Sequence, residues 1–482
     1  MMDLTLLDAT AQAELVRTGE VSPTELVDQA IARIERLNPT LNAIIHPRFE
    51  RARVEAAAPA DGPFRGVPFV LKDILGMQAG EPYHMGLRRL KDLAVTLPID
   101  SYFTQRIRAA GFVILGRTNV PELGTLCQTE SAAYGPCRNP WSPEHSTGGS
   151  SGGSACAVAA GMVAAAHAND GGGSIRIPAS ECGLVGLKPS RGRSSFGPAA
   201  GAPVGGMVSD GVVTRSVRDT AAILDVIAGP MPGDTFVAPP PARPYVQEVG
   251  APTGTLRIGL MTAAPGASFQ PHADCTAAAT VAATALAALG HRVEEAHPSA
   301  LDDPALGHHF TVMYATHIAR TLDLIAGLTG TPFTAADVDA VNWMLKMVGE
   351  GTSAPQYHAT VDWLYDFTRA IAEWHAGGFD LLLTPTIAEP PPRLGELVPT
   401  VENALAVGAR AAQIACWTLP FNLTGQPAIS LPLHWNAAGL PIGVQLVAAY
   451  GREDVLLRVA AALEVALPWR DRRPAVDVPG RA

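Results

Sequence analysis

The chain has 482 residues, of which 47% are hydrophobic and 17% charged, proportions that suit a soluble globular protein with a large buried core. Its formal net charge of −10 argues against binding to nucleic acid or to an anionic membrane surface. Six cysteines without a CxxC pair predict neither a disulfide framework nor a zinc knuckle.

The N-terminal stretch MMDLTLLDATAQAE has no basic segment and no long apolar run, so we expect no signal peptide and a reducing, cytoplasmic location. Two helices are expected within the first forty residues. Ser22-Pro23-Thr24-Glu25 has the form of a capping box with proline at the first helical position. The helical pattern that follows is expected to end at Asn38-Pro39.

Short apolar runs between turn residues indicate buried strands at 66–73 (GVPFVLKD) and 111–119 (GFVILGRTN). Helical patterns lie between such strands, which favours an α/β layered fold. From residue 139 to 190 the chain is rich in Gly, Ser and Ala, and the apolar run 155–166 (ACAVAAGMVAAA) is expected to be a buried helix too short to span a bilayer.

The proline-rich segment 230–252 predicts a rigid surface connection that could mark a domain boundary. Beyond it we expect a helix from Cys275 to about Gly290, and another of roughly fifteen residues from Glu453. Strands are expected at 256–261, 379–386, 427–433 and 442–448. Segment 300–375 places aromatic, His and Met residues in helical patterns, which predicts amphipathic helices on the core, with a few residues as candidates for a pocket wall.

The stretch STGGSSGGSACAVAAG (146–161) admits several interpretations. A flexible linker is a poor one, because the glycines run directly into an apolar helix, and a Walker-type phosphate loop lacks its Gly-Lys-Ser/Thr. Residues 148–152 match G-x-S-x-G formally. However, the preceding RNPWSPEHST contains two prolines where a nucleophile elbow needs a strand, and the later His375 and His434 have no supporting context.

A second cluster, HANDGGGSIRIPASECGLVGLKPS, runs from residue 167 to 190. Its three consecutive glycines allow backbone N–H groups to converge before Ser174, as in an oxyanion hole. Asp170 and Arg176 flank them and are interpreted as a buried ion pair that holds the loop. A serine nucleophile needs a base. Lys72 is a candidate because burial in its apolar strand would lower the pKa of the amine, although a lysine in a strand is more often paired or snorkelling.

Taken in order, GVPFVLKD, GGSSGGSA and NDGGGSIRIPASECGLVGLKPS closely resemble the amidase signature family, and the resemblance extends over nearly the whole chain. Ser150 and Ser174 are 24 residues apart, the usual separation of the two catalytic serines in that family. The resemblance implies an α/β fold in which a large mixed β-sheet lies between α-helices in one compact domain spanning 1–482. The signature core would occupy about 60–220.

The resemblance also implies a role for each site residue. Ser174 would be the acylated nucleophile, Ser150 a proton relay on a cis peptide bond after Gly149, and Lys72 the general base. The oxyanion hole would be formed by the backbone N–H groups of Gly171, Gly172, Gly173 and Ser174. No cofactor and no metal are implied, and the positive end of the helix after Ser154 would point toward the site.

The function implied is that of an amide hydrolase working through an acyl-enzyme. DATAQAELVR, RNPW and GVQLVAAYGRED are similar to nylon-oligomer amidases, which implies small linear or cyclic amides such as 6-aminohexanoate oligomers. Carbamate, aryl-amide and ester hydrolysis remain open, because the same oxyanion chemistry serves them. An amidotransferase A subunit shares the signature, but the acidic charge argues against tRNA binding.

The substrate pocket is expected where relatives line their acyl site, and this chain differs there from the nylon-oligomer amidases. Asn169 stands where the wider family often has threonine, as the resemblance to the nylon-oligomer subgroup implies. The implied partner is a small-molecule amide, and a homodimer remains open. The pocket candidates are Thr125, Leu126, Cys127, Tyr314, His317 and Trp343.

Overall fold

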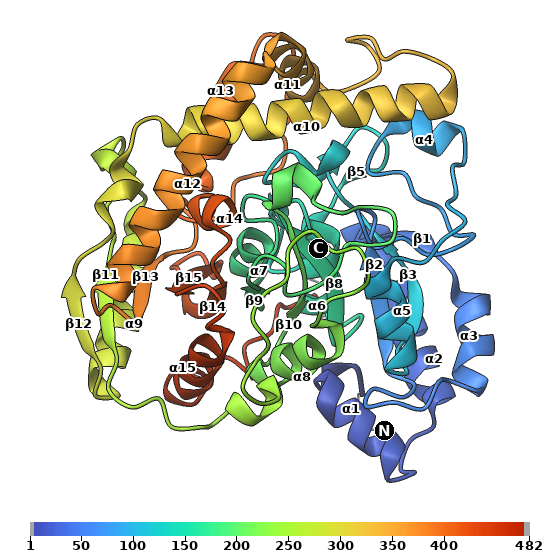
Figure 1. The fold of residues 1–482 in the computed structure, drawn as a ribbon. Coiled ribbons are helices and arrows are strands. Elements are labelled where there is room, and N and C mark those ends of the chain that lie inside the picture. Colours follow the sequence, from blue (N-terminus) through green and yellow to red (C-terminus); the bar gives the residue numbers. More distant parts are fainter. Residues whose placement is uncertain (1–3, 477–482) are drawn as a thin grey trace.

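Eleven strands form one mixed sheet in the computed structural model, which describes residues 4–476 (Figure 1). This confirms the large mixed sheet among helices that the family resemblance implied. The strands follow one another across the sheet in the order β1 (Ile44–Pro47), β3 (Val113–Thr118), β2 (Pro68–Lys72), β8 (Ala165–Asp170), β10 (Ser209–Thr214), β9 (Val185–Lys188), β14 (Ala428–Trp435), β15 (Pro441–Ala448), β13 (Leu381–Pro385), β11 (Arg257–Leu260) and β12 (Arg292–Glu295).

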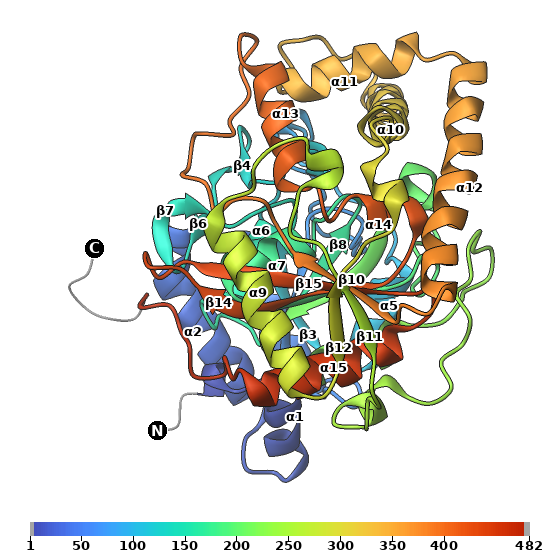
Figure 2. The same ribbon diagram turned by 90° about the vertical axis from the view of Figure 1, so that its left-hand side faces the viewer.

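Alternate residues of the strands face two helical layers, because successive side chains of a strand point to opposite faces. Val70 and Val113 pack into one core with α2 (Pro23–Leu41), α6 (Gly152–Ala159) and α7 (Arg176–Cys182). Phe69 and Ile114 pack into the other with α5 (Tyr102–Ala109), α8 (Val217–Ile227) and α15 (Glu453–Ala466). Figure 2 shows helices on both sides of the sheet.

The remaining elements lie around this centre. Near the N-terminus are α1 (Ala9–Arg17), α3 (Phe49–Ala57) and α4 (Arg88–Asp92), and two small ribbons follow, β4–β5 (Glu130–Ser131, Gly135–Pro136) and β6–β7 (Arg138–Asn139, Ser142–Ser146). Helix α9 (Ala273–Ala288) packs on β13, β14 and β15, and α14 (Pro420–Thr424) precedes β14.

Four helices, called the cap here, pack on the sheet and on one another. The long α10 (Leu306–Thr329) runs across the top of Figure 1, and α11 (Ala340–Gly351), α12 (Ala354–Ala376) and α13 (Ala404–Ile414) lie beside it. The helices expected within 300–375 are therefore confirmed. Within residues 4–476, no helix has the length and apolar character needed to cross a bilayer.

Most strands expected from apolar runs are confirmed, among them β2, β3 and β11. Two boundaries were wrong. Pro39 lies inside α2, which continues to Leu41 and ends where Asn42 adopts a left-handed conformation with φ of 53°. The run 155–166 is not one helix, because α6 stops at Ala159 and β8 begins at Ala165 after a turn.

The N-terminal and proline-rich segments complete the description. Residues 1–3 of the stretch examined for a signal peptide lie outside the described residues, and α1 begins after Asp8, which caps it. Segment 230–252 is mostly exposed and irregular, with one short turn at Tyr245–Glu248, between α8 and β11.

The topology brings two chemically important strand ends together. β2 and β8 are parallel neighbours, with Phe69 opposite Ala165 and Val70 opposite Ala166. The carboxyl ends of parallel strands meet at the same edge of a sheet, where α/β folds commonly place their sites. Lys72 ends β2 and Asp170 ends β8. The basic residue and the glycine-rich turn after Asp170 therefore come to the same place.

Candidate active site

Lys72 is fully buried at the end of β2, and its ammonium group reaches three oxygen atoms. Its Nζ lies 2.8 Å from Ser150 Oγ, 2.6 Å from Asn169 Oδ1 and 3.3 Å from the Asn169 carbonyl. Burial lowers the pKa of Lys72 to about 7, although the carboxylates of Asp170 and Asp210 oppose this change. Near neutral pH a large fraction of this amine is therefore unprotonated and able to accept a proton.

Ser150 lies in a tight loop between β7 and α6, and the Gly149–Ser150 peptide bond is cis, as the resemblance implied. Glycine is required at 149, because a Cβ there would lie 2.4 Å from the carbonyl oxygen of Gln128. Ser151 Oγ donates to the Asn169 carbonyl at 3.3 Å, and Gly148 N–H donates to Ser146 Oγ at 2.9 Å. These contacts fix the loop that presents Ser150 to Lys72.

Asp170 and Arg176 form the buried ion pair expected from the sequence, and it organises the turn that carries Ser174. Arg176 donates to both carboxylate oxygens of Asp170 at 2.9 Å, and both side chains are fully buried. Burial opposes ionisation of Asp170, but the Arg176 guanidinium holds the pKa of that carboxyl well below its usual range. From the C-terminal part of the chain, Asn422 and Gln445 accept further N–H bonds from Arg176.

The predicted oxyanion hole needs one correction. The N–H of Gly173 donates to Asp170 Oδ1 at 2.7 Å, so it is not directed at a substrate in this structure. The N–H groups of Gly171, Gly172 and Ser174 are left as the candidate donors. The Tyr314 hydroxyl crowds the same turn, because a Cβ at Gly171 would lie 2.5 Å from Tyr314 Oη.

Two cavities share Ser174 as part of their lining. A cavity of about 340 Å³ is lined mainly by aliphatic and small residues of the 124–127 loop and of α10, α11 and α13. A smaller one of about 190 Å³ contains Ser150 and Asn169 together with Ser174. Gly124 and Tyr314 also line both cavities. Ser174 is therefore accessible from two neighbouring cavities.

The predicted pocket residues divide between these cavities. Thr125, Leu126 and Cys127 line the larger cavity, and His317 lines the smaller one. The Thr125 hydroxyl donates to Asn342 Oδ1 at 2.5 Å, which joins the 122–125 loop to α11. Burial lowers the pKa of His317, so its imidazole is neutral near pH 7.

Trp343 lines neither cavity. It packs instead against the apolar cluster of Leu87, Leu322 and Phe333, while the next residue on α11, Met344, lines the larger cavity. Consecutive residues of a helix point about 100° apart, which explains why only one of the two reaches the pocket.

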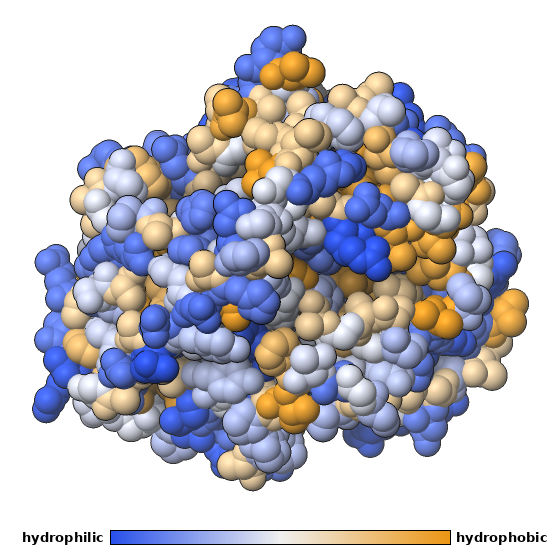
Figure 3. Space-filling model, turned by 45° about the horizontal axis from the view of Figure 1, so that its top comes forward, coloured by the Kyte–Doolittle hydropathy of each residue, from blue (hydrophilic) through white to orange (hydrophobic). Residues whose placement is uncertain are grey.

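The predicted Tyr314 lines both cavities, whereas several other lining residues, Phe310 among them, were missed by the sequence argument. Phe310 and Tyr314, one helical turn apart on α10, stack with their ring centroids 4.9 Å apart, and Phe310 lines the larger cavity. Small residues of α13, among them Gly408 and Ala412, complete its wall. Leu405 lines this cavity and is also 77% exposed, so the cavity reaches the surface near α13. Apolar patches interrupt the polar surface in Figure 3, which brings the top of the molecule forward.

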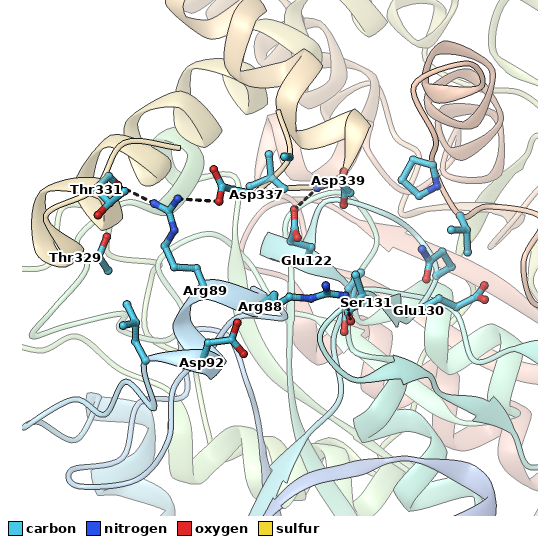
Figure 4. Close-up of a pocket in the computed structure, with 18 residues that line it drawn as sticks. Arg88, Arg89, Asp92, Glu122, Glu130, Ser131, Thr329, Thr331, Asp337 and Asp339 are labelled. Carbon is cyan, nitrogen blue, oxygen red and sulfur yellow. Dashed lines mark hydrogen bonds and ion pairs between the residues drawn. The ribbon is translucent and has the colours of Figure 1, made fainter. Parts of the chain in front are cut away.

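A separate hollow of about 600 Å³ lies between α4, the end of α10 and the segment before α11 (Figure 4). It contains charged groups, but Arg89 is paired with Asp337 at 3.0 Å and also donates to the Thr331 carbonyl. None of the residues described as lining it is Lys72, Ser150 or Ser174. Within residues 4–476, no group of three or more His, Cys, Asp or Glu side chains is arranged to hold a metal ion.

Comparison with known proteins gives a consistent result. The family model described as Amidase matches residues 25–457. The 6-aminohexanoate-cyclic-dimer hydrolase of Paenarthrobacter ureafaciens is 47% identical over 481 residues, which cover 98% of this chain and 97% of that protein.

Solved structures agree with the sequence comparison. A structure of 6-aminohexanoate cyclic dimer hydrolase complexed with substrate is similar at a TM-score of 0.95 and 46% identity, covering 98% of this chain and 99% of that one. A bacterial aryl acylamidase is similar at a TM-score of 0.84 and 28% identity, with 96% of each chain covered. The similarity therefore extends to the whole fold.

Proposed function

Since this chain belongs to the amidase signature family, we propose that it hydrolyses small uncharged amides such as the cyclic 6-aminohexanoate dimer, through an acyl-enzyme. One observation carries the proposal. A buried lysine amine lies 2.8 Å from the Ser150 hydroxyl, and Ser150 lines the same cavity as Ser174. A neutral amine beside a hydroxyl relay is what activation of a serine nucleophile requires.

In this proposal Ser174 attacks the amide carbonyl. Its hydroxyl proton moves to Ser150 Oγ, the proton of Ser150 moves to Lys72 Nζ, and Ser174 Oγ bonds to the carbonyl carbon. The N–H groups of Gly171, Gly172 and Ser174 stabilise the developing oxyanion. Collapse breaks the C–N bond, and the proton held by Lys72 returns through Ser150 to the leaving amine. Water then cleaves the acyl ester by the same proton path, giving the carboxylic acid and free Ser174.

The character of the cavities supports an uncharged substrate. Among the described residues that line either cavity, none is Asp, Glu, Lys or Arg. A cyclic dimer has neither a free ammonium nor a free carboxylate, whereas the linear dimer carries both. A charge placed in such a cavity would lose its hydration without gaining a partner, which is costly. We therefore favour the cyclic over the linear dimer.

A hydrolysis screen tests the proposal. It compares the cyclic dimer, the linear dimer, an acyl anilide, a carbamate and an ester, with amine or alcohol release as the readout. We expect the cyclic dimer to be cleaved faster than the linear dimer. Ser174→Ala should reduce cleavage to background, whereas Ser268→Ala, at an exposed turn, should retain wild-type rates. Near-normal activity of folded Ser174→Ala would overturn the assignment of the nucleophile.

Aryl amides are the second candidate. The stacked rings of Phe310 and Tyr314 beside Ser174 offer an aromatic surface against which a substrate ring can pack. The aryl acylamidase similarity, at 28% identity, supports the same idea more weakly than the 47% relative supports a cyclic dimer. Strong anilide cleavage with no cleavage of either aminohexanoate dimer would favour this candidate.

A further inference from the structure

A buried histidine and a buried aspartate lie directly behind Lys72, and the proposed chemistry does not use them. His167 and Asp210 are on the neighbouring strands β8 and β10, and both are almost completely buried. The Lys72 backbone N–H donates to His167 Nδ1 at 3.2 Å, and His167 Nε2 lies 3.2 Å from Asp210 Oδ1. One hydrogen-bonded chain therefore connects the Asp210 carboxylate to the backbone of Lys72.

The geometry fixes the tautomer of His167. Because Nδ1 accepts a hydrogen bond from a backbone N–H, it carries no proton, and the ring proton must be on Nε2, from which it is donated to Asp210. Burial lowers the pKa of His167, although Asp210 opposes the change, so the ring stays neutral. The Phe103 ring packs on the imidazole, with centroids 4.3 Å apart.

The backbone also makes room for this histidine. A Cβ at Gly76 would lie 2.6 Å from His167 Nδ1, so only glycine permits the close approach. Arg117 holds the other side of Lys72, because its guanidinium donates to the Lys72 carbonyl at 3.0 Å and to Asp73 at 2.8 Å. The residue that carries the amine is thus held by its N–H and by its carbonyl.

The charged groups around Lys72 are not equivalent. Asp73 is paired with Arg117 and Asp170 with Arg176, so both carboxylates have a cationic partner. Within the described part of the chain, the basic side chain paired with Asp210 is His167, which is neutral. Among the described residues Asp210 therefore has no cationic side-chain partner of its own, and its charge acts together with that of Asp170 to favour a protonated Lys72.

We propose that His167 and Asp210 are positioning residues for Lys72: they anchor its backbone, and the charge of Asp210, together with that of Asp170, stabilises the protonated form of the Lys72 amine. The proposal rests on the function proposed above, in which Lys72 is the base. Without Asp210 the amine would be neutral at a lower pH and would be a weaker acceptor for the Ser150 proton.

The test uses Asp210→Asn, whose side-chain oxygen can still accept from His167 while the charge is removed. The chain has four lysines (Lys72, Lys91, Lys188 and Lys346), so protein labelled with ¹³C at lysine Cε gives few NMR signals to follow with pH. The measurement is made in a Ser174→Ala background without substrate. We expect the Lys72 midpoint to fall by about 0.5–1 pH unit, less than a charge in direct contact would cause.

Asp225→Asn is the matched control, because Asp225 is on α8 and accepts the backbone N–H groups of Tyr245 and Val246. It should leave the Lys72 midpoint unchanged. An unchanged midpoint in folded Asp210→Asn would overturn the proposal. If that variant does not fold, ¹⁵N NMR of His167 in the wild-type protein provides a second test. A proton on Nδ1, or an imidazolium at pH 7, would overturn the proposal.

In enzyme that keeps Ser174, Asp210→Asn should shift the acidic limb of the pH profile of kcat/KM by the same amount as the Lys72 midpoint measured by NMR. The two proposals fail in distinguishable ways. A shifted Lys72 midpoint without hydrolysis of any amide, carbamate or ester would leave the positioning role in place and contradict the proposed function. Robust amide hydrolysis with an unmoved Lys72 midpoint would support the proposed function and contradict the positioning role.

Discussion

At the scale of single residues, the hydrogen-bond partners of Lys72 match the needs of a neutral amine. Such an amine has two N–H donors and one lone pair. The two Asn169 oxygens can accept hydrogen bonds from both N–H groups of the amine, which leaves its lone pair directed toward the Ser150 hydroxyl. The orientation of the Asn169 amide is fixed, because its Nδ2 donates to the Ile74 carbonyl at 2.8 Å.

The first prediction concerns pH. The pKa of Lys72 is lowered to about 7, so the protonated, inactive form dominates below that pH and the neutral base above it. We expect kcat/KM to rise with pH through about 7. Lys72→Arg, which cannot deprotonate, should lose about 10²–10⁴-fold in kcat. Lys91→Arg is the control, since Lys91 bonds to the Ala133 carbonyl away from both cavities. A flat pH profile between 5 and 9 would contradict this prediction.

Asn169 gives the second prediction. Asn169→Ala removes an acceptor 2.6 Å from Lys72 Nζ while leaving the backbone in place. Lys72 becomes charged when it accepts the Ser150 proton, and a hydrogen bond to a charged group contributes about 1.5–3 kcal/mol, so we expect kcat/KM to fall roughly 10- to 150-fold. The control Asn403→Ala, at an exposed turn, should have wild-type kinetics. Equal rates for both variants would show that Asn169 does not orient the base.

At the scale of elements, the cap helices depend on close packing between α10 and α11. A Cβ at Gly349 of α11 would lie 2.2 Å from the Ala315 carbonyl oxygen of α10. Gly349→Ala should therefore separate the helices that carry Tyr314 and Met344, lowering the free energy of unfolding by about 1–3 kcal/mol and reducing activity.

Gly327→Ala is the matched control within α10. A Cβ there meets no atom within 4 Å among the described residues, so the substitution should raise the free energy of unfolding by about 0.5–1 kcal/mol. Urea denaturation and kcat/KM of both variants check the pair. Equal stabilities would contradict the tight contact.

Contact between α15 and α8 gives a prediction for stability. Glu464 of α15 accepts the N–H of Val217 at the start of α8, and burial raises the pKa of Glu464 to about 7. A carboxyl with a raised pKa stabilises the fold at low pH, and that contribution is lost as the pH rises through about 7. Glu464→Gln should match wild-type stability near pH 5 and exceed it by about 1 kcal/mol at pH 9, after allowance for screening.

Urea denaturation at the two pH values measures this difference. Glu35→Gln, on the exposed side of α2, should change neither value. A stability difference between Glu464→Gln and the wild type that is the same at pH 5 and pH 9 would show that Glu464 ionises normally in the folded protein.

The sequence predicted the strands that consist of apolar residues and missed a strand that carries polar residues of the candidate site. The strands β2 and β3 carry continuous apolar runs, and their boundaries were predicted within two residues. β8, with the sequence AAHAND, was not, because His167, Asn169 and Asp170 serve Lys72 and Ser174 rather than a strand pattern. The polar residues that broke the strand pattern also indicated a functional site.

The part of the site that lies in recognisable sequence motifs was predictable. Lys72, Ser150 and Ser174 are in recognisable stretches, and the structure brings Lys72 to Ser150 and places both serines around one cavity. The role of Gly173 was not predictable, because the direction of one N–H depends on a local turn. The wall contributed by α13 depends on tertiary packing that no local pattern encodes.

At the scale of the whole molecule, the N-terminal and C-terminal parts of the chain form adjoining parts of one sheet. The N-terminal strands end at β9, and its next neighbour is β14, followed by β15, β13 and β11. The C-terminal part also holds the turn that carries Ser174, because Asn422 donates to the Asp170 carbonyl at 2.8 Å and Gln445 accepts from Arg176. We therefore propose that residues 1–482 fold as one domain.

Truncation tests this proposal. A fragment of residues 1–230 contains the signature core but leaves β9 without β14, and the buried Arg176 loses its partners Asn422 and Gln445. We expect this fragment to unfold without a cooperative transition and to be cut rapidly by proteases, whereas the full chain should unfold cooperatively. A cooperative transition of the fragment would indicate two domains.

The late position of β14 and β15 in the chain has a consequence for biosynthesis. While the protein is being made, Lys72, Ser150 and Ser174 have all left the ribosome before the strands that complete their sheet exist. The nascent chain therefore exposes an unpaired strand edge at β9 for the synthesis of some 240 further residues. An unpaired strand edge can pair with another chain, so we expect the nascent protein to be most prone to aggregation during this interval.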